Sequence, residues 1–379
     1  MDLVRPLGLA GIDCAVVARR GEAPWCSRFS RAKIPWIDPS AHPGELVRAL
    51  LDFARAQPEP PILYYQDDPA MLAISRHREA LSEAFRFLMP DPGLVEALAD
   101  KAGFAVLAAR LGLPVPATRV IGTDGPGAAT AVDLPYPVIV KPAQHLTAWS
   151  AASGSKAIEA GDRETLERVV RDLGVATPRL VVQARIAGPE TRIDSYHVFV
   201  DAGGSIAGEF TGRKIRTYPR HYGYSTAVEI TDDREVRELG RECVRALDLR
   251  GVAKLDFKRD MDGRLWLLEV NPRFTLWHLP GALAGVNLPA LVFADLTGRP
   301  RPSPKPLCSG TTWCEPRRDF QARKAEHIPA LRWAVWALTA DAKRSIALDD
   351  PMPFVAGIVG RRVLEWVVRA GRRRARSKR

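Results

Sequence analysis

Hydrophobic and polar positions along the first ninety or so residues alternate between strand-like and helix-like periods. The segments 12–19 (IDCAVVAR) and 61–67 (PILYYQD) are short apolar runs of the kind that form strands. Between them, residues 43–56 (PGELVRALLDFARA) repeat apolar side chains at helical spacing, which predicts an amphipathic helix that begins at a proline. The pattern therefore predicts a small α/β unit over residues 1–95.

The region from 96 to 300 predicts a larger domain that mixes helices and strands. A helical pattern stops at the Gly-Leu-Pro of residues 112–114, and a buried strand then leads through LPYPVIVKP, residues 134–142. The segments that follow are a helix at 162–173, a strand at 179–186, two strands joined by a turn at Gly203-Gly204, and a helix at 233–249. A proline-rich stretch at 298–306 then predicts the start of a separate C-terminal segment.

The clearest pattern lies in residues 254–274, KLDFKRDMDGRLWLLEVNPRF. Asp262-Gly263 is a strong signal for a tight hairpin, because a type I′ turn needs positive φ at both central residues. With these two residues in the loop, pairing places Asp256 opposite Glu269 and Lys254 opposite Asn271. Since side chains alternate with a period of two, these four share a polar face. The other, apolar face is predicted to contain Leu255, Phe257, Trp266, Leu268 and Val270.

The polar face of this hairpin brings two carboxylates and an amide oxygen together. Directly opposed residues have Cβ atoms about 4.5–5.5 Å apart, and like charges at that distance are destabilising. Oxygen ligands of this kind suit a hard divalent cation such as Mg²⁺. The pairing by itself leaves two interpretations open: a metal site, or a solvated polar face on which Lys254 and Lys258 neutralise the acids.

Composition places the chain among globular proteins of two or three domains, with 379 residues, 46% of them hydrophobic. The five cysteines are scattered and lack metal-type CxxC spacing, which predicts a reducing, cytoplasmic compartment rather than a disulfide framework. The N-terminus has no sustained apolar core, so no signal peptide is expected. The longest uncharged run, 274–294, is interrupted by proline and glycine and is not typical of a membrane span.

The net charge of +11 is concentrated at one end of the chain. Residues 361–379 contain eight Arg and one Lys against Glu365, a net of +8, so residues 1–360 carry +3. The body of the protein therefore lacks the basic surface of a nucleic-acid-binding protein. Residues 354–369 also repeat apolar side chains at helical spacing. Two alternatives follow: a helix on an anionic membrane surface, or a helix packed on the body with a basic tail.

Several segments, in this order, resemble the ATP-grasp superfamily: ADKAGF…GLPVPATR, YPVIVKP, the Ser/Gly segment SAASGSK, VVQARIAGPE, and Asp256 followed by EVNPR. The resemblance covers roughly residues 90–300 and is greatest to the carboxylate–amine ligases, such as D-alanine–D-alanine ligase and D-aspartate ligase-type enzymes, with biotin carboxylase more distant. It implies an α/β (α+β) ATP-grasp fold. A small N-terminal α/β domain (1–95) would precede a two-part ATP-grasp domain (96–300) with its lid at about 115–182, followed by a helical C-terminal extension (301–379).

Relatives usually begin with a strand and a glycine-rich turn before the first helix. The first residues here, MDLVRPLGLAGI, already resemble that helix. The resemblance therefore predicts that the N-terminal domain lacks its first strand, or that the start codon is assigned late.

The resemblance also implies which residues bind the nucleotide and its metal. The ligands of Mg²⁺ or Mn²⁺ would be Asp256, Glu269 and Asn271, in agreement with the hairpin pairing. Lys101 and Lys141 are expected at the phosphates of ATP, and Glu190 at its ribose hydroxyls. The loop over the phosphates would contribute Ser153, Gly154 and Ser155, although this loop has fewer glycines than is usual. The backbone of the strand end would bind adenine at Gln183, Ala184 and Ile186.

Three basic residues are expected to act in catalysis. By resemblance, Arg273 would meet the carboxylate or acyl phosphate, since its planar fork binds such oxygens bidentately. Lys254 would stabilise charge on the same intermediate. Arg213, with its neighbour Lys214, would hold the γ-phosphate. For Arg213, Lys214 and Lys254 a structural ion pair is an equal alternative.

The implied function is an ATP-dependent carboxylate–amine ligase, which forms an amide through an acyl phosphate and releases ADP and phosphate. Its partners would be a small-molecule carboxylate and an amine, with no specific nucleic acid and with peripheral contact to anionic membrane through the tail. One alternative is a bicarbonate-using carboxylase, although the chain has no biotin-carrier segment. Another is a non-catalytic nucleotide-binding or membrane-surface protein, which the retention of all three predicted metal ligands disfavours. The sequence names neither substrate and does not give the oligomeric state.

Overall fold

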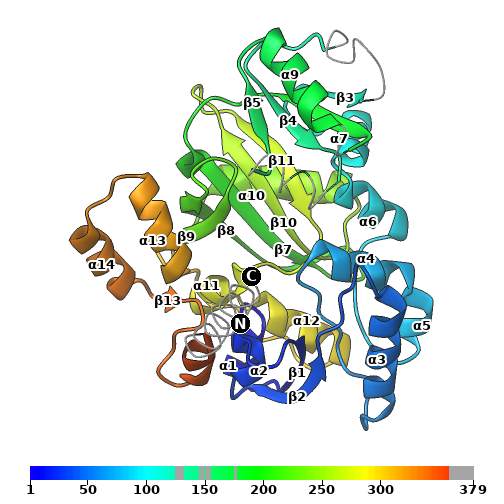
Figure 1. The fold of residues 1–379 in the computed structure, drawn as a ribbon. Helices are drawn as coiled ribbons and strands as arrows, with labels where there is room; N and C mark the ends of the chain where they lie inside the picture. The colour runs from blue at the N-terminus through cyan, green and yellow to red at the C-terminus, as the bar shows by residue number, and fades with distance from the viewer. Residues whose placement is uncertain (124–131, 145–148, 150–154, 175–176, 358–379) are drawn as a thin grey trace, which may run out of the picture.

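The computed structural model describes residues 1–123, 132–144, 149, 155–174 and 177–357 (Figure 1). Three sheets organise these residues: one of two strands, one of four and one of seven. In Figure 1 the seven-stranded sheet lies in the middle of the molecule, the four-stranded sheet above it and the two-stranded sheet below. The predicted mixed α/β fold class is therefore confirmed.

The central sheet has the strand order β11-β10-β7-β8-β9-β12-β13. Neighbouring strands are antiparallel, except β12 and β13, which are parallel. Turns at the predicted positions Gly203-Gly204 and Asp262-Gly263 join β7 to β8 and β10 to β11. The predicted two-residue type I′ turn is wrong, however, because β10 and β11 are joined by the five-residue loop 260–264, in which Gly263 but not Asp262 has a positive φ. Gly204 and Gly263 have φ values of +88° and +90°, a conformation that costs little only for glycine. The strands are β7 (Ile193–Val200), β8 (Ile206–Tyr218), β9 (Tyr224–Thr231), β10 (Gly251–Arg259), β11 (Leu265–Asn271), β12 (Thr312–Cys314) and β13 (Ala342–Lys343).

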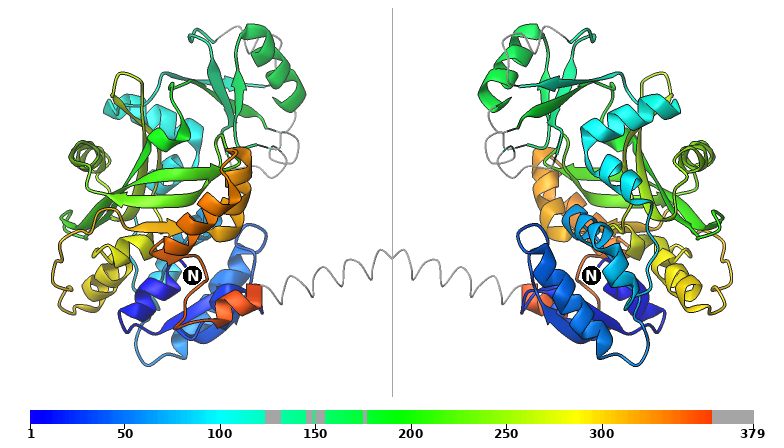
Figure 2. Two further views of the ribbon diagram at one scale, coloured as in Figure 1. Left: turned by 90° about the vertical axis from the view of Figure 1, so that its left-hand side faces the viewer. Right: turned by 90° about the vertical axis from the view of Figure 1, so that its right-hand side faces the viewer.

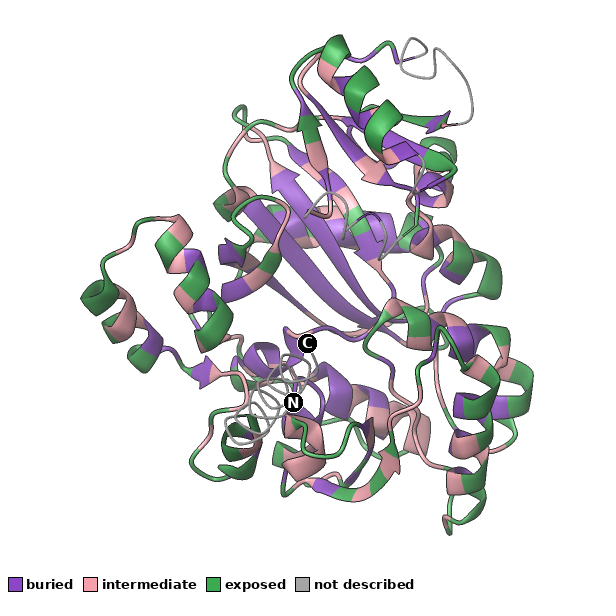
Figure 3. Cartoon of the chain, viewed as in Figure 1, coloured by how far each residue is buried: buried purple, intermediate pink, exposed green. Residues whose placement is uncertain are grey.

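The two faces of this sheet pack against different helices. One face is covered by α10 (Arg234–Ala246) together with α6 (Pro92–Ala99) and α7 (Lys101–Leu111). The opposite face packs against α11 (His278–Leu283) and α12 (Leu288–Thr297). The strands between these layers are largely buried (Figure 3). Core side chains of the first face include Tyr196, Val198, Leu255 and Phe257, and those of the second include Phe199, Phe210, Val252 and Trp277.

The four-stranded sheet runs from Thr118 to Ala184, so it nearly coincides with the segment predicted as the lid, at about 115–182. Its antiparallel order is β3-β6-β4-β5. The strands are β3 (Thr118–Gly122), β4 (Val138–Pro142), β5 (Ile158–Ala160) and β6 (Arg179–Ala184), and α9 (Arg163–Leu173) packs on them. β4 is buried along most of its length, as the apolar run VIV predicts, because it lies between two strands and beneath α9.

The N-terminal unit has a parallel pair of strands and several helices. These are α1 (Val4–Leu9), β1 (Cys14–Ala18), α2 (Ala23–Cys26), β2 (Ser30–Pro35), α3 (Pro43–Arg55), α4 (Asp68–Arg76) and α5 (Arg78–Ser82). The prediction of a strand at 61–67 is wrong: the described segment makes only a single bridge, between Ile62 and Arg86. The reason is that its end pairs elsewhere, since the Tyr65 carbonyl accepts a hydrogen bond from the Phe274 N–H.

The β10–β11 hairpin confirms the predicted register at one end and departs from it at the other. Lys254 is paired with Asn271 and Asp256 with Glu269, as expected. A β-bulge then follows, so that Phe257 is paired with Leu267. One extra residue reverses the side-chain alternation beyond it. As a result Trp266 and Leu268 are not on the apolar face, and Leu265 and Leu267 occupy the core in their place.

The C-terminal residues contribute to the central sheet as well as to helices. β12 pairs with β9, and β13 extends the sheet beyond β12. α13 (Pro316–Ala325) and α14 (Ala330–Thr339) pack beside β8 and β9, and a further helical stretch covers residues 352–357. No helix in the described residues is long and apolar enough to cross a bilayer.

A short segment, residues 344–350, connects the central sheet to the N-terminal unit, and we call it the strap. Arg344 Nη2 donates to Asp2 Oδ2 at 2.9 Å, and Arg5 Nη2 donates to Asp349 Oδ1 at 3.1 Å. Asp350 is buried and accepts hydrogen bonds from Ser27 Oγ and from the Arg28 N–H, at 2.5 and 3.0 Å. The two ends of the described chain are thus bound to each other.

Candidate active site

A row of buried charged side chains crosses the second face of the central sheet, which we call the site face. Lys254, Asp256 and Lys258 alternate along β10 on this face. Asp256 Oδ1 accepts a hydrogen bond from Ser195 Oγ, on β7, at 2.5 Å. Asp256 Oδ2 accepts from Lys254 Nζ at 2.6 Å and from Lys214 Nζ, on β8, at 3.3 Å. One carboxylate therefore meets two ammonium groups.

The two lysines decide the ionisation of Asp256. Burial by itself would raise the pKa of this carboxyl group, but the attraction of Lys214 and Lys254 outweighs burial and lowers the pKa. Asp256 is therefore ionised at neutral pH. Because two lysines share one carboxylate, the group retains an excess of positive charge that an anionic ligand can balance.

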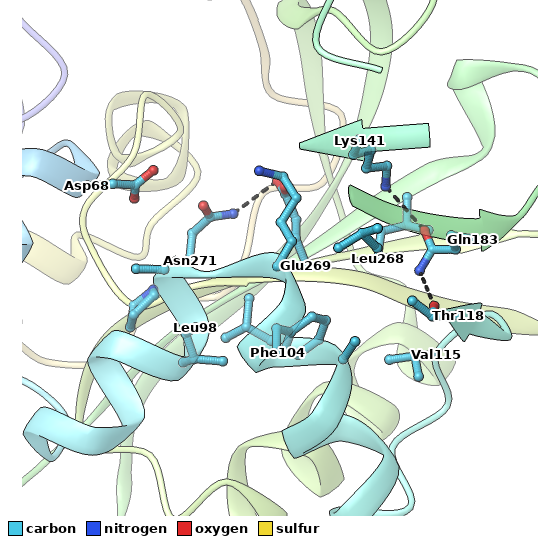
Figure 4. A pocket seen from close by; sticks show the side chains of 16 residues that line it. Asp68, Leu98, Phe104, Val115, Thr118, Lys141, Gln183, Leu268, Glu269 and Asn271 are labelled. Atoms are coloured by element: carbon cyan, nitrogen blue, oxygen red, sulfur yellow. Dashed lines mark hydrogen bonds between the residues drawn. The ribbon is translucent and has the colours of Figure 1, made fainter. Parts of the chain in front are cut away.

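Glu269 and Asn271 lie across the hairpin from this row, on the last residues of β11. Asn271 Nδ2 donates to Glu269 Oε1 at 3.0 Å (Figure 4). The Glu269 side chain is exposed, in contrast to Asp256, which is 2% exposed. Two carboxylates and one amide oxygen are the donors that Mg²⁺ prefers, so the chemistry of this set fits the metal. In the part of the chain that the structure describes, no group of three or more His, Cys, Asp or Glu side chains forms a metal site.

A pocket opens beside Glu269 between β11, α7 and the four-stranded sheet (Figure 4). Its polar side is a chain of two hydrogen bonds: Lys141 Nζ donates to Gln183 Oε1 at 3.2 Å, and Gln183 Nε2 donates to Thr118 Oγ1 at 3.0 Å. Apolar walls are formed by Leu98, Phe104, Val115, Val181 and Leu268, and the polar residues Asp68, Lys101, Glu269 and Asn271 also line the pocket. A cavity with apolar walls and a few oriented polar groups suits a flat heteroaromatic ring.

Three further lysines surround Glu269, and each has a lowered pKa because it is buried. Burial lowers the pKa of Lys141 to about 8, and Glu269 opposes the shift. Lys156 has a pKa of about 8 for the same two reasons, and its Nζ lies 3.2 Å from the centre of the Tyr224 ring. The pKa of Lys101, at the start of α7, is lowered by burial and partly restored by Glu269 and Asp68. Half-buried ammonium groups near one exposed carboxylate favour a polyanionic ligand.

Arg273 lies next to these residues but is paired with the N-terminal unit. Its Nε donates to Asp68 Oδ1 at 2.5 Å, and its Nη2 donates to Asn271 Oδ1 at 3.2 Å. Asp68 begins α4 and lines the pocket. The predicted catalytic arginine is thus close to the predicted metal ligands, with its fork held by a carboxylate 205 residues away in the sequence.

Arg213 is not part of the site, which corrects the prediction that it binds the γ-phosphate. Arg213 Nε donates to Asp194 Oδ1 at 2.7 Å, and Asp194 and Arg259 lie on the opposite face of the sheet from Asp256. The cause is the period of two along β8, which directs neighbouring side chains to opposite faces. Lys214, the next residue, is the one that reaches Asp256.

The other predicted nucleotide ligands lie next to strands of the four-stranded sheet or in the turn before β7. Glu190 is close to β10, with Oε1 3.7 Å from Lys258 Nζ. Ala184 donates its N–H to the Ala117 carbonyl, and Ile186 follows the end of β6. Ser155 Oγ donates to the Ala157 carbonyl at 2.9 Å. Ser153 and Gly154 lie outside the described residues.

Three residues of the site had no role in the sequence-based prediction: Ser195, Asp68 and Thr118. Ser195 could have been found by pairing β7 with β10, since it is directly opposite Asp256. Asp68 and Thr118 have no comparable signal, because they contact the site from other parts of the fold. The pairing of each with Arg273 or Gln183 depends on tertiary structure alone.

Residues 176–313 match the family model described as "ATP-grasp in the biosynthetic pathway with Ter operon". The D-alanine–D-alanine ligase of Ectopseudomonas mendocina (strain ymp) is 28% identical over 204 residues, which cover 49% of this chain and 60% of the ligase. The chain thus spans less than two thirds of the length of this curated relative.

Two solved structures share the architecture at low sequence identity. The biotin carboxylase of Campylobacter jejuni, solved as a β-γ-ATP complex, has a TM-score of 0.64 and 17% identity over 82% of this chain and 71% of its own. The L-amino acid ligase of Bacillus licheniformis has a TM-score of 0.54 and 18% identity over 73% of this chain and 64% of its own. Together with the family match, these similarities show that the chain has the ATP-grasp fold and confirm the resemblance drawn from its motifs.

Proposed function

We propose that this ATP-grasp protein is a ligase that joins a carboxylate to an amine. The observation that carries the proposal is a cluster of buried and half-buried lysines near Asp256 and Glu269, beside a pocket with apolar walls. A carboxylate oxygen of the first substrate would attack the γ-phosphorus of ATP, breaking its bond to the β–γ bridging oxygen and releasing ADP. The amine nitrogen would then attack the acyl carbon, so that phosphate leaves, the amine loses a proton and an amide remains.

Asp256, Glu269 and Asn271 would hold Mg²⁺, or Mn²⁺, at the phosphate end of the pocket. When bound, the metal supplies charge neutralisation at the transferred phosphoryl group. The lysines of the chain would neutralise the remaining negative charge of the phosphates. Lys101, Lys141 and Lys156 would surround the phosphates, while Lys214 and Lys254 would keep Asp256 ionised and oriented. Placement of this kind lowers the barrier without reorganisation during the reaction.

The base of ATP would occupy the pocket between β11 and the four-stranded sheet. Leu268 and Val181 supply apolar walls, and Gln183 supplies a side-chain amide already oriented by Lys141 and Thr118. Because the pocket lies between two sheets, closure of the upper sheet on the central one would exclude water from the phosphates. Exclusion of water protects an acyl phosphate from hydrolysis.

Arg273 would bind the carboxylate that is to be activated. Its guanidinium is presented beside Asn271, and Asp68 holds its orientation. A substrate carboxylate would share this guanidinium with Asp68 or replace it. Arg273→Lys would keep the charge but lose the planar fork, so activity should fall although the pair with Asp68 can persist.

The test is turnover with Mg-ATP, hydroxylamine and a pool of carboxylic acids, read for ADP, AMP and hydroxamate. Acid-dependent ADP release with formation of a hydroxamate is expected, because hydroxylamine intercepts an acyl phosphate. AMP and pyrophosphate would indicate an adenylate and contradict the proposal. ADP release that depends on bicarbonate, with no hydroxamate from any acid, would replace the ligase by a carboxylase-type reaction. Arg119→Lys, on an exposed arginine of the lid, is the matched control for Arg273→Lys and should leave turnover unchanged.

A further inference from the structure

Exposed large apolar side chains are concentrated in one part of the described chain. On α14, Leu331 and Leu338 are 78% and 77% exposed, and Val335 lies between them on the same side of the helix. Leu348, in the strap, is fully exposed. In Figure 1 α14 lies at the left-hand edge of the molecule, and the helical stretch 352–357, in red, lies lower, beside the N-terminal unit; the left panel of Figure 2 shows both from that side. We call the following set the apolar patch: Leu331, Val335, Leu338, Leu348, Met352, Phe354 and Val355.

This exposure does not come from a loose end of the chain. α14 is held by its inner side, where Trp333 Nε1 donates to Asp319 Oδ2 at 2.8 Å and the Trp336 ring lies beneath Arg216. The strap is held on the N-terminal unit through Asp349 and the buried Asp350. The main chain of α14 and of the strap is therefore anchored, and the apolar side chains of both are still exposed. Several exposed large apolar side chains on one side of an anchored helix mark an interaction site.

The charge of the adjoining sequence indicates what covers this patch. Residues 361–379, which directly follow it, carry a net charge of +8, whereas residues 1–360 carry +3. A second copy of the chain on the patch would bring two such segments together, and like charges repel. An anionic lipid surface satisfies both features, because it takes up apolar side chains at the headgroup boundary and attracts Lys and Arg.

We propose that the apolar patch docks this protein on an anionic membrane surface, with the basic C-terminal sequence neutralising lipid headgroups. α14 and the strap directly flank β13 in the chain, and β13 is at one edge of the central sheet, while the pocket beside Glu269 lies at β11, the other edge. The protein can therefore bind lipid and leave the pocket open to small molecules. Two weak interactions, insertion of apolar side chains and attraction of basic residues to anionic headgroups, together give the reversible binding typical of peripheral proteins.

Sedimentation of the full-length protein with lipid vesicles tests the proposal. The vesicles are phosphatidylglycerol and phosphatidylcholine in equal parts, or phosphatidylcholine alone. Binding is expected only to the anionic vesicles, with a decline as salt is added. The patch variant Leu331→Ser/Leu338→Ser/Leu348→Ser should bind about tenfold more weakly, because it loses apolar insertion. A form ending at Gly357 should bind at least about a hundredfold more weakly, since it loses the net charge of the tail.

The matched control is Val106→Ser/Met261→Ser/Leu283→Ser, which changes three exposed apolar residues outside the patch and should bind as the unchanged protein does. Thermal unfolding of both triple variants verifies that they are folded. Three results would overturn the proposal. They are no binding of the full-length protein to anionic vesicles at low salt, undiminished binding by the patch variant, and a dimer in light scattering that only the patch variant abolishes.

Discussion

Two buried aspartates accept hydrogen bonds from neighbouring basic residues of β8, Asp319 from Arg216 and Asp256 from Lys214, but their surroundings are opposite. Asp319, on α13, is 0% exposed and accepts two hydrogen bonds from Arg216, at 2.9 and 2.7 Å. Thr226 Oγ1 and Trp333 Nε1 also donate to it, each at 2.8 Å. Asp256 is almost as buried, but it accepts hydrogen bonds from two lysines, Lys214 and Lys254, and further lysines lie nearby. One carboxylate is matched by one cation and neutral donors; the other lies in an excess of positive charge.

The difference separates a structural ion pair from a ligand site. A buried charge that is fully paired holds elements together, and here it attaches α13 and α14 to β8 and β9. A buried cluster with uncompensated charge of one sign is unfavourable until a ligand of the opposite sign arrives. Burial alone therefore does not identify an active site in this protein; the balance of charge around the buried group does.

The largest effect is expected from removing the structural aspartate. Asp319→Ala leaves the Arg216 guanidinium buried without its partner and should lower the free energy of unfolding by about 3–5 kcal/mol. Urea denaturation followed by circular dichroism measures it. Asp133→Ala is the matched control, since its pair with Arg119 is exposed, and its unfolding midpoint should not change. A normal midpoint for Asp319→Ala would contradict the structural role.

Glu269 provides the contrasting case, in which function is lost and stability is kept. Glu269→Gln should reduce Mg-ATP turnover about 10²–10³-fold, in the range found for loss of one electrostatic group at a reacting centre. Because the side chain is exposed, the free energy of unfolding should change by no more than about 0.5 kcal/mol. Turnover is measured with the acid identified by the hydroxylamine screen. Unaltered turnover would remove Glu269 from the metal site.

The smallest effect concerns the pH dependence of the lysine cluster. Lys141 has a pKa of about 8 in the folded, unliganded protein, so it is cationic below that pH and loses its charge above it. The affinity for an ATP analogue should therefore fall about tenfold from pH 7 to pH 9 for each lysine that titrates there. Calorimetry measures the affinity. Lys141→Arg should bind with a flatter profile, because arginine stays charged; an identical profile in both proteins would exclude Lys141 as the cause.

Protein stability should depend on pH in the opposite direction to ligand affinity: it should rise, not fall, as Lys141 loses its proton. The pKa of Lys141 is lowered from 10.5 in the folded state, so protonation costs folding free energy. In the absence of ligand, the contribution of Lys141 to stability should increase as the pH rises from about 8 toward 10.5. Unfolding experiments across that range, with Lys141→Met as reference, measure this contribution.

Local pattern predicted the hairpin that carries Asp256 and Glu269, and the pairing is as predicted at these two residues, although the register next to the turn is shifted by one residue. It failed at Trp266 and Leu268, since a bulge adds one residue without any mark in the composition. The resemblance pointed to Arg213 together with Lys214, because the sequence alone did not indicate which of these two neighbours lies on the same face as Asp256. The helices at 43–56, 162–173 and 233–249 were predicted correctly, since each has a full amphipathic period.

Pairings between distant segments could not be predicted from the sequence. Asp68 meets Arg273 across 205 residues, and Arg216 meets Asp319 across 103. Neither carboxylate belongs to a motif, and each depends on how a helix packs against a sheet. The nucleotide-binding motifs are recognisable because they are local, whereas the contacts that orient them are not.

The strap has a consequence for the order in which the protein is assembled during synthesis. Its contacts join residues 322 to 344 positions apart, from Arg28 with Asp350 to Arg5 with Asp349. The ribosome delivers the N-terminal unit first, yet Ser27 and Arg28 gain these partners only after residue 350 has left the exit tunnel. The part of the chain that is made first thus completes its packing last. Nascent chains halted before the strap should leave this unit accessible to protease, and chains that include it should not.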